Sequence, residues 1–464
     1  MIKKNQFSVA MGSVALLMTT ATLAVPFNSF DPKSMAMGGA GVAVANPSTA
    51  SFFNPALLSI AETKDDFAIE FPVFGVRVYD PDDFADAVDD FNDTAFDDLD
   101  AAINGGSIDG VPVTGFNNDS LNPASVTPVT TSINSLNTEI EKISDKPLEL
   151  EGGIGLVVGI PGEKFGMALS ASASFNFSGI FEYRDKSTVD SLTSDMDLLA
   201  SCLGDPVLAV SAACAADKFT FVTITGDVGS TADPDINFTT EDDIESQVQI
   251  IGVAMEEVGL SFSREMAMFG TEVAVGVTPK MVSVTIFDYK ADADSADTDN
   301  IDGDDYSADY SDFNLDIGIA MDHKNGWRSG LVIKNIISQD YDAMNINDQG
   351  DEVPTGTVVS LKPQARAGVS HTNGWSTVAL DVDLTENEAL GEIGNNSRYI
   401  ALGVELNALD WAQLRFGYRA DTVNSERNVM SAGFGVSPFG IHIDLGVAGN
   451  QNEVGASFQL GFRF

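Results

Sequence analysis

The chain has 464 residues, a net charge of −45 and a sequence pI of about 4.1. A nucleic-acid-binding surface requires an excess of positive charge, so this balance excludes that class of function. Beyond the N-terminus, no stretch approaches the ~18 consecutive apolar residues of a membrane-spanning helix. If the chain crosses a membrane, we therefore expect it to do so with β-strands.

Residues 1–24 have the pattern of a secretory signal peptide. Lys3 and Lys4 give a positive start, and an interrupted apolar run follows over residues 7–23. Small residues then precede a cleavage point before Val25. The alternative is a transmembrane anchor, but the run is short for one and is broken by polar residues. We therefore predict an exported protein.

Residues 25–64 are not predicted to form regular strands. From Ser34 to Ile60 this stretch is nearly uncharged and rich in glycine and other small residues. It contains the runs Ser34-Met35-Ala36-Met37-Gly38-Gly39-Ala40-Gly41 and Phe53-Asn54-Pro55-Ala56-Leu57. Small residues allow close backbone packing, and glycine permits sharp turns. Such a segment suits the crowded interior of a barrel.

These two runs resemble the N-terminus of the TraF-like outer-membrane family. That family carries a conjugal-transfer name and is related to the FadL-type transporters of long-chain fatty acids and other hydrophobic compounds. The resemblance implies a barrel of about fourteen strands that is plugged by an N-terminal hatch. The hatch residues that it implies are Ser34, Met35, Met37, Gly38, Gly39, Gly41, Asn54, Pro55 and Ala56. The F-plasmid protein called TraF resembles thioredoxin-like periplasmic proteins, whereas this chain has no C-x-x-C motif.

The first strand candidate covers residues 67–79, and a change of phase near Pro72 predicts a bulge in it. The next segment, residues 80–149, holds sixteen acidic residues against two lysines. Runs of like charge are solvated, so we place this segment outside the membrane as a long external loop. Ile133, Leu136 and Ile140 recur at helical spacing within it and predict a helix.

A second helical stripe in the same loop is a candidate contact for hydrophobic molecules. Its members are Phe84, Val88, Phe91 and Leu99, which recur at spacings of three and four. In the FadL family, helices in long external loops form the entry groove for lipid. The alternative is that these helices only cap the barrel.

A hairpin follows, with a turn at residues 161–164 and a return strand that starts at Phe165. Large apolar residues alternate in this strand with small or polar ones through Phe177. A lipid-facing side and a lumen-facing side require this pattern. The next long loop, residues 184–243, holds Cys202 and Cys214. A close pair of cysteines in an exported chain predicts a disulfide.

Residues 289–312 form a third long acidic loop with nine aspartates and one lysine. Several of the aspartates crowd around Gly303, but their spacing does not match an EF-hand. A solvated surface is therefore the favoured reading, and we predict no metal site. The weak candidates for cation binding are Asp297, Asp299, Asp302 and Asp304.

Tight turns recur along the chain, and an aromatic residue follows or closes each of them. The motif His-x-Asn-Gly-Trp occurs at residues 323–327 and again at 371–375, and Asn-Gly strongly favours a hairpin turn. Another turn is predicted at residues 264–267. Aromatic rings concentrate at membrane–water boundaries. The predicted aromatic girdle consists of Phe165, Phe269, Trp327, Trp375, Trp411 and Phe439.

The last strand, residues 454–464, alternates apolar and small or polar residues and ends on Phe464. A terminal Phe resembles the C-terminal signature of outer-membrane proteins and implies recognition by the barrel-assembly machinery. The strand candidates from Phe67 onward number about fourteen. We therefore predict an all-β, transmembrane antiparallel barrel over residues 65–464, embedded in outer-membrane lipid of a Gram-negative bacterium. Both termini should be periplasmic, and the oligomeric state is left open.

The sequence contains no arrangement typical of catalysis. The three histidines, His323, His371 and His442, do not belong to a triad-like or metal-binding motif, so we predict no enzyme activity and no cofactor. Two functions remain. One is passive uptake of apolar small molecules across the outer membrane. The other is a structural or interaction role in conjugative transfer or at the cell surface.

Overall fold

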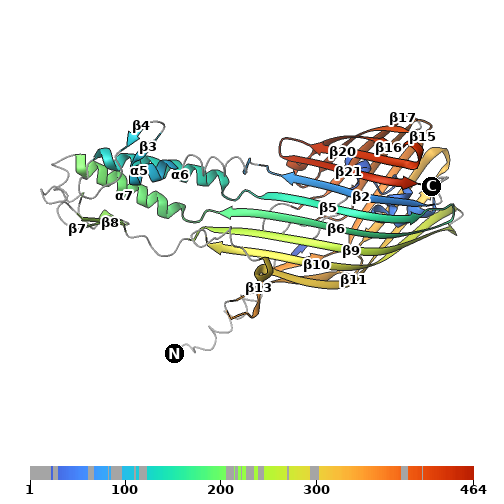
Figure 1. Cartoon of the computed structure of the whole chain (residues 1–464), viewed down its shortest axis with the longest axis horizontal. Coiled ribbons are helices and arrows are strands. Elements are labelled where there is room, and N and C mark those ends of the chain that lie inside the picture. The colour runs from blue at the N-terminus through green and yellow to red at the C-terminus, as the bar shows by residue number, and fades with distance from the viewer. Residues whose placement is uncertain are drawn as a thin grey trace, which may run out of the picture.

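The computed structural model (Figure 1) describes residues 22–24, 30–60, 67–81, 83–84, 97–108, 111–113, 123–204, 214, 218–220, 222–225, 235–238, 245–268, 271–292, 303–347, 349–387, 396–409 and 411–463. Fourteen strands form one closed antiparallel barrel, in which the first strand pairs with the last. The predicted fold class is therefore confirmed.

The barrel strands follow one another in chain order around the wall. Their bounds are β2 (Ala68–Tyr79), β5 (Leu148–Ile160), β6 (Phe165–Glu182), β9 (Gln247–Met268), β10 (Thr271–Asp292), β11 (Ser307–Asp322), β12 (Trp327–Lys334), β15 (Gln364–Asn373), β16 (Ser376–Asp383), β17 (Tyr399–Leu409), β18 (Ala412–Asp421), β19 (Val429–Val436), β20 (Ile441–Gly449) and β21 (Glu453–Arg463).

The remaining elements lie in the lumen or in the connections. Those before the barrel are β1 (Thr22–Ala24), α2 (Pro32–Ala36), η2 (Pro47–Thr49), α3 (Ala50–Phe53) and η3 (Pro55–Ser59). The long connections hold α5 (Asp97–Asn104), β3 (Gly106–Ile108), β4 (Val111–Val113), α6 (Pro123–Ile143), α7 (Lys186–Gly204), β7 (Val222–Thr225), β8 (Asp235–Phe238), η8 (Gly303–Tyr306), β13 (Gln339–Ile346) and β14 (Glu352–Leu361). Short 3₁₀ turns are η9 (Lys324–Gly326), η10 (Ser425–Arg427) and η11 (Pro438–Gly440).

Alternation along the strands separates an apolar outside from a polar inside. In β6, Phe165 and Leu169 are exposed, whereas Ala168 and Ser170, on either side of Leu169, are buried. In β21, Val454 is exposed and Gln459 is buried. The first set faces out of the barrel and the second faces the lumen, which is the period-two alternation typical of membrane barrels.

The structure corrects one predicted turn and confirms one predicted bulge. The predicted turn at residues 264–267 lies inside β9, which continues to Met268. The stretch from Val359 to His371 is divided between β14 and β15, because β14 belongs to a separate hairpin outside the barrel ladder. The bulge near Pro72 is present as a register shift between Glu70 and Val73, as predicted.

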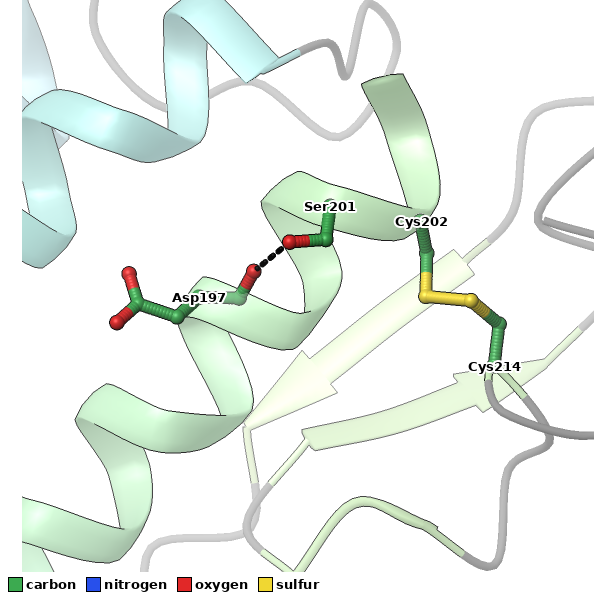
Figure 2. Close-up of a disulfide and its surroundings, with 4 residues drawn as sticks. All are labelled: Asp197, Ser201, Cys202 and Cys214. Atoms are coloured by element: carbon green, nitrogen blue, oxygen red, sulfur yellow. Dashed lines mark hydrogen bonds between the residues drawn. A yellow bond between two sulfur atoms is a disulfide. The ribbon is translucent and has the colours of Figure 1, made fainter. Parts of the chain in front are cut away.

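The two ends of the barrel differ. One end carries the tight turns, and the other carries the long connections, from which α5, α6 and α7 project away from the barrel (Figure 1). Ala102, Val126 and Met196 belong to a small core that these helices share. The predicted disulfide is present between Cys202, on α7, and Cys214 (Figure 2). Among the described residues, no helix is both long and apolar enough to cross a bilayer.

The barrel wall is much taller on one side than on the other. β9 and β10 have 22 residues each, whereas β12, β16 and β19 have 8 each. A tilted strand needs only ~9–11 residues to cross the hydrocarbon layer. The far halves of β6, β9, β10 and β11, which we call the tall wall, therefore extend beyond the apolar band at the long-loop end.

The N-terminal strand β1 pairs in parallel with β14, at the long-loop end of the barrel. The start of β2 and the end of β21 lie together at the opposite end. The periplasmic location of both termini stays a prediction. Cleavage before Val25 stays a prediction, and it would remove β1.

Candidate functional site: the barrel lumen

Residues 30–60, here called the N-terminal segment, lie inside the barrel. Helix α2 packs against β18, β19, β20 and β21, and η3 packs against β6, β9, β10 and β11 on the other side. Met37, Phe53 and Leu57 are almost completely buried. The predicted hatch residues are thus brought together in the lumen, while their role as a plug stays a proposal.

A ring of glycines in the wall makes room for this segment. A Cβ atom on Gly433 would lie 2.5 Å from the Cβ of Ala36, and one on Gly330 would lie 2.6 Å from the carbonyl oxygen of Val42. Such distances are incompatible with a side chain. The other wall glycines that meet the segment are Gly75, Gly153, Gly155, Gly166, Gly276, Gly318, Gly368, Gly403, Gly417 and Gly446.

Polar side chains of the wall hold the backbone of the segment. Asp381, on β16, accepts hydrogen bonds at Oδ2 from the backbone N–H groups of Gly41 (2.7 Å) and Val42 (2.9 Å). Ser431, on β19, accepts from the N–H of Gly38 and donates to the carbonyl of Ala36, at 3.0 Å each. Buried backbone groups need such partners, so these contacts fix the course of the segment.

Asn54, in the Asn-Pro-Ala run, joins two parts of the segment to the wall. Its Nδ2 donates to the carbonyls of Val42 and Ile319, both at 3.1 Å, and its Oδ1 accepts from the N–H of Ala56 at 3.1 Å. The side chain is fully buried. Because the three bonds use the amide as donor and acceptor together, no other short side chain replaces it.

The inner wall carries paired charges. Lys280 contacts Glu257 at 2.6 Å and Asp316 at 3.0 Å. Arg415 lies between Glu405, at 2.7 Å, and Asp444, at 2.5 Å. The further lumen pairs are Arg77–Glu151, Arg77–Glu453, Arg366–Asp383, Arg419–Glu453, Arg427–Glu149 and Lys33–Glu405. Buried charges require such pairing, so the lumen is polar but internally matched.

A cavity of about 80 Å³ lies between the N-terminal segment and the wall, and we call it the lumen cavity. Its apolar lining comes from the segment and from inward-facing wall residues: Phe30, Phe52, Val73, Val253 and Met255. Its polar lining includes Ser172, Ser174, Glu257, Lys280, Lys334, Asn335 and Gln364. The Nζ of Lys334 also donates to the carbonyl of Phe52 at 3.1 Å, which ties the cavity wall to the segment.

Asp31 lies at the edge of this cavity and caps α2. Its Oδ1 accepts from the N–H of Ser34 at 2.8 Å, while its Oδ2 is buried and has no hydrogen-bond partner. Burial raises the pKa of Asp31 from 3.8 to about 6, and the nearby carboxylate of Asp444 adds to the increase. The Ser34 N–H, Arg415 and Lys33 act in the opposite direction.

The predicted loop contact is not assembled in the part of the chain that the structure describes. Phe84 is half-buried, and its N–H donates to Asp80 Oδ1 at 2.7 Å. Val88 and Phe91 lie outside the described residues, as does the side chain of Leu99 on α5. The contact stays a prediction.

The aromatic residues of the predicted girdle lie at the short-turn end. Phe165, Trp327, Trp375, Trp411 and Phe439 are all exposed. Phe269 and Phe464 lie outside the described residues. The membrane role of the girdle and the assembly role of Phe464 stay predictions.

The weak cation candidates lie mostly outside the described residues, whereas the three histidines are described. Asp297, Asp299 and Asp302 and the side chain of Asp304 lie outside the described residues, and the described ones contain no group of three metal-ligating side chains. His323 contacts Ser329, and His371 packs on Trp327. His442 lies in the lumen beside Glu70.

The paired charges of the lumen were not predicted from the sequence. Lys280, Arg366 and Arg415 each occupy an inward position of a strand whose outward positions are apolar. A charged residue at an inward position, between apolar residues that face outward, is the sequence signal that could have identified them. Their partners Glu257, Asp383 and Glu405 lie on the adjacent strands β9, β16 and β17, so the pairing depends on the strand register.

The family model described as "F plasmid transfer operon, TraF, protein" matches residues 51–383. The chain belongs to this TraF family. The match includes the Phe53–Leu57 run and confirms the resemblance drawn from the sequence. No curated protein sequence matches the TraF-family chain at a significant level.

Several solved structures are similar to this TraF-family barrel at low identity. The toluene transporter TbuX of Ralstonia pickettii is 12% identical, with 94% of this chain and 99% of that chain covered and a TM-score of 0.49. The toluene transporter TodX of P. putida is 11% identical, with 95% and 99% covered and a TM-score of 0.46. A Pseudomonas aeruginosa FadL homologue is 12% identical, with 96% and 99% covered and a TM-score of 0.44.

Proposed function

We propose that the protein is an outer-membrane barrel through which apolar small molecules enter passively, without catalysis. The observation that carries the proposal is the lumen cavity. Phe30, Phe52 and Val253 give part of its lining an apolar surface, and polar groups that include Ser174, Glu257, Lys280 and Lys334 form the rest. Ligand sites in proteins combine an apolar lining with placed polar groups.

In this proposal the N-terminal segment is the plug that separates the cavity from the periplasm. The close packing of Gly330 and Gly433 on the segment supports a tight seal. Movement of the segment, rather than a permanent pore, would then release a bound molecule. The external stripe that begins at Phe84 is proposed as the landing site for hydrophobic molecules. Replacing Phe84 and Phe91 with Asp should reduce uptake without changing barrel assembly.

The second candidate is an interaction role in conjugative transfer. It rests on the description of the TraF family, which names a transfer operon. No contact or cavity among the described residues favours it over uptake. A failed uptake test would therefore favour this interaction role.

A filled cavity tests the uptake proposal. Ser174 lines the cavity from β6, and its chain neighbour Ala173 has the opposite phase and faces outward. Ser174→Trp should abolish uptake of a fluorescent apolar probe by proteoliposomes, whereas Ala173→Trp should leave it unchanged. If the unmodified protein admits no more probe than empty liposomes, the uptake proposal is wrong.

A further inference from the structure

The hairpin of β13 and β14 stands on the inner face of the tall wall. Tyr341, Ala343, Val359 and Leu361 of the hairpin are buried against the wall, and each is at most 3% exposed. Their partners on β9 and β10 are the inward-facing residues Ile251, Val253, Val282, Val284 and Ile286. The hairpin therefore occupies the lumen at the long-loop end.

The same hairpin lies next to the lumen cavity, toward the long-loop end. Val253 belongs both to the core under the hairpin and to the cavity lining. Asn335, in the connection that precedes β13, and Gln364, directly after the connection that follows β14, also line the cavity. The two strands of the hairpin thus start and end at the cavity, so any movement of the hairpin changes the cavity.

The enclosed space of the cavity is small. It measures about 80 Å³, whereas pockets for drug-sized ligands measure roughly 300–1,000 Å³. A ligand of that size would need elements next to the cavity to move apart. The wall strands are fixed in continuous ladders on both sides, which leaves the hairpin as the element free of the barrel ladder at that end.

The base of the hairpin has the properties of a hinge. Asn335 has a φ of +54° and its buried Oδ1 has no hydrogen-bond partner. Asn accepts this left-handed conformation more readily than most residues. Its N–H donates to Asp316 Oδ1 at 2.9 Å, and Asp316 also contacts Lys280 in the cavity wall. Near the tip, Thr355 Oγ1 donates to Asp288 Oδ2 at 2.6 Å and holds the hairpin to β10.

We infer that the β13–β14 hairpin is a lid that turns about Asn335 and opens the lumen cavity toward the long-loop end. The nature of the entering molecule rests on the proposed function, but the opening itself does not. Lys280 lines the cavity and contacts Asp316, which accepts the N–H of Asn335, so these two residues connect the cavity to the hinge. Opening separates the buried face that includes Val359 and Leu361 from the wall.

A reversible disulfide tests the lid. Asp288→Cys with Thr355→Cys joins the hairpin to β10, and the protein has no free cysteine among its described residues to interfere. Uptake of the apolar probe should fall at least about tenfold after oxidation, equivalent to about 1.4 kcal/mol, and should recover on reduction. The single variant Thr355→Cys is the control and should not respond. If the unmodified protein takes up the probe, equal uptake in the oxidised and reduced double variant overturns the lid.

A second measurement does not depend on uptake. Ser172→Cys places a thiol in the cavity, and its modification by a small water-soluble thiol reagent reports access. Adding Val359→Ser and Leu361→Ser should speed modification by at least about tenfold, whereas Ile346→Ser and Val353→Ser, at exposed positions of the same hairpin, should not. An unchanged rate overturns the lid. A faster rate in a protein that takes up no probe supports the lid and rejects the uptake proposal alone.

Discussion

Replacing Asn54 with alanine is expected to loosen the N-terminal segment from the barrel wall. The change removes three hydrogen bonds of 3.1 Å each, to Val42, Ile319 and Ala56. At about 1 kcal/mol net for each bond, docking of the segment should weaken by about 3 kcal/mol. The fraction of molecules with an undocked segment should then rise roughly 150-fold.

Limited proteolysis measures this fraction. Chymotrypsin can cut after Phe53 only when the segment leaves the wall, so with fast reclosing the cleavage rate follows the open population. Asn46→Ala is the matched control, because Asn46 is partly exposed and accepts one bond, from Lys33 Nζ at 3.1 Å. Its effect should stay below about tenfold. Equal cleavage rates for the two variants would refute the reasoning.

Four other changes have defined outcomes. Gly417→Leu should displace the segment and raise ion conductance in planar bilayers, whereas Gly179→Leu, in open space, should not. The pKa of Asp31 is raised from 3.8 to about 6, so docking of the N-terminal segment should weaken by about 3 kcal/mol as pH rises from below 3.8 to above 6. The rate of proteolysis of the Asp31→Asn variant should not show this pH dependence. Replacing Cys202 and Cys214 with Ser should destabilise the α7 region by at most about 2–4 kcal/mol and expose it to protease without affecting the barrel. Deleting Phe464 should lower the yield of heat-modifiable barrel in cells, and normal yield would contradict its assembly role.

The barrel could be predicted because each strand carries its own signal. The alternation from Phe165 to Phe177 and the repeated His-x-Asn-Gly-Trp turns are local, so they can be read one strand at a time. The β13–β14 hairpin could not be separated from the barrel in this way. Its residues alternate like those of a wall strand, and only pairing decides that β12 neighbours β15.

The lumen site was predictable only in part. The small residues near Gly38 and the Asn54 motif indicated a segment inside the barrel. Its partners could not be named, because Asp381 and Ser431 are more than 300 positions away along the chain. The lumen cavity depends on side chains from the segment and several strands at once, and no local pattern encodes such a set.

The wall glycines have a consequence for the order of assembly. The segment touches β2 and β21, the two strands whose pairing closes the barrel, and also strands midway around the wall. The segment is held on opposite sides of the wall, by β19 and β20 on one side and by β9 and β10 on the other. We therefore expect it to be in place when the last strand pairs with the first. Each wall glycine costs its strand roughly 0.5–1 kcal/mol of stability relative to alanine. A barrel that closed without the N-terminal segment would lack the packing contacts that offset this cost.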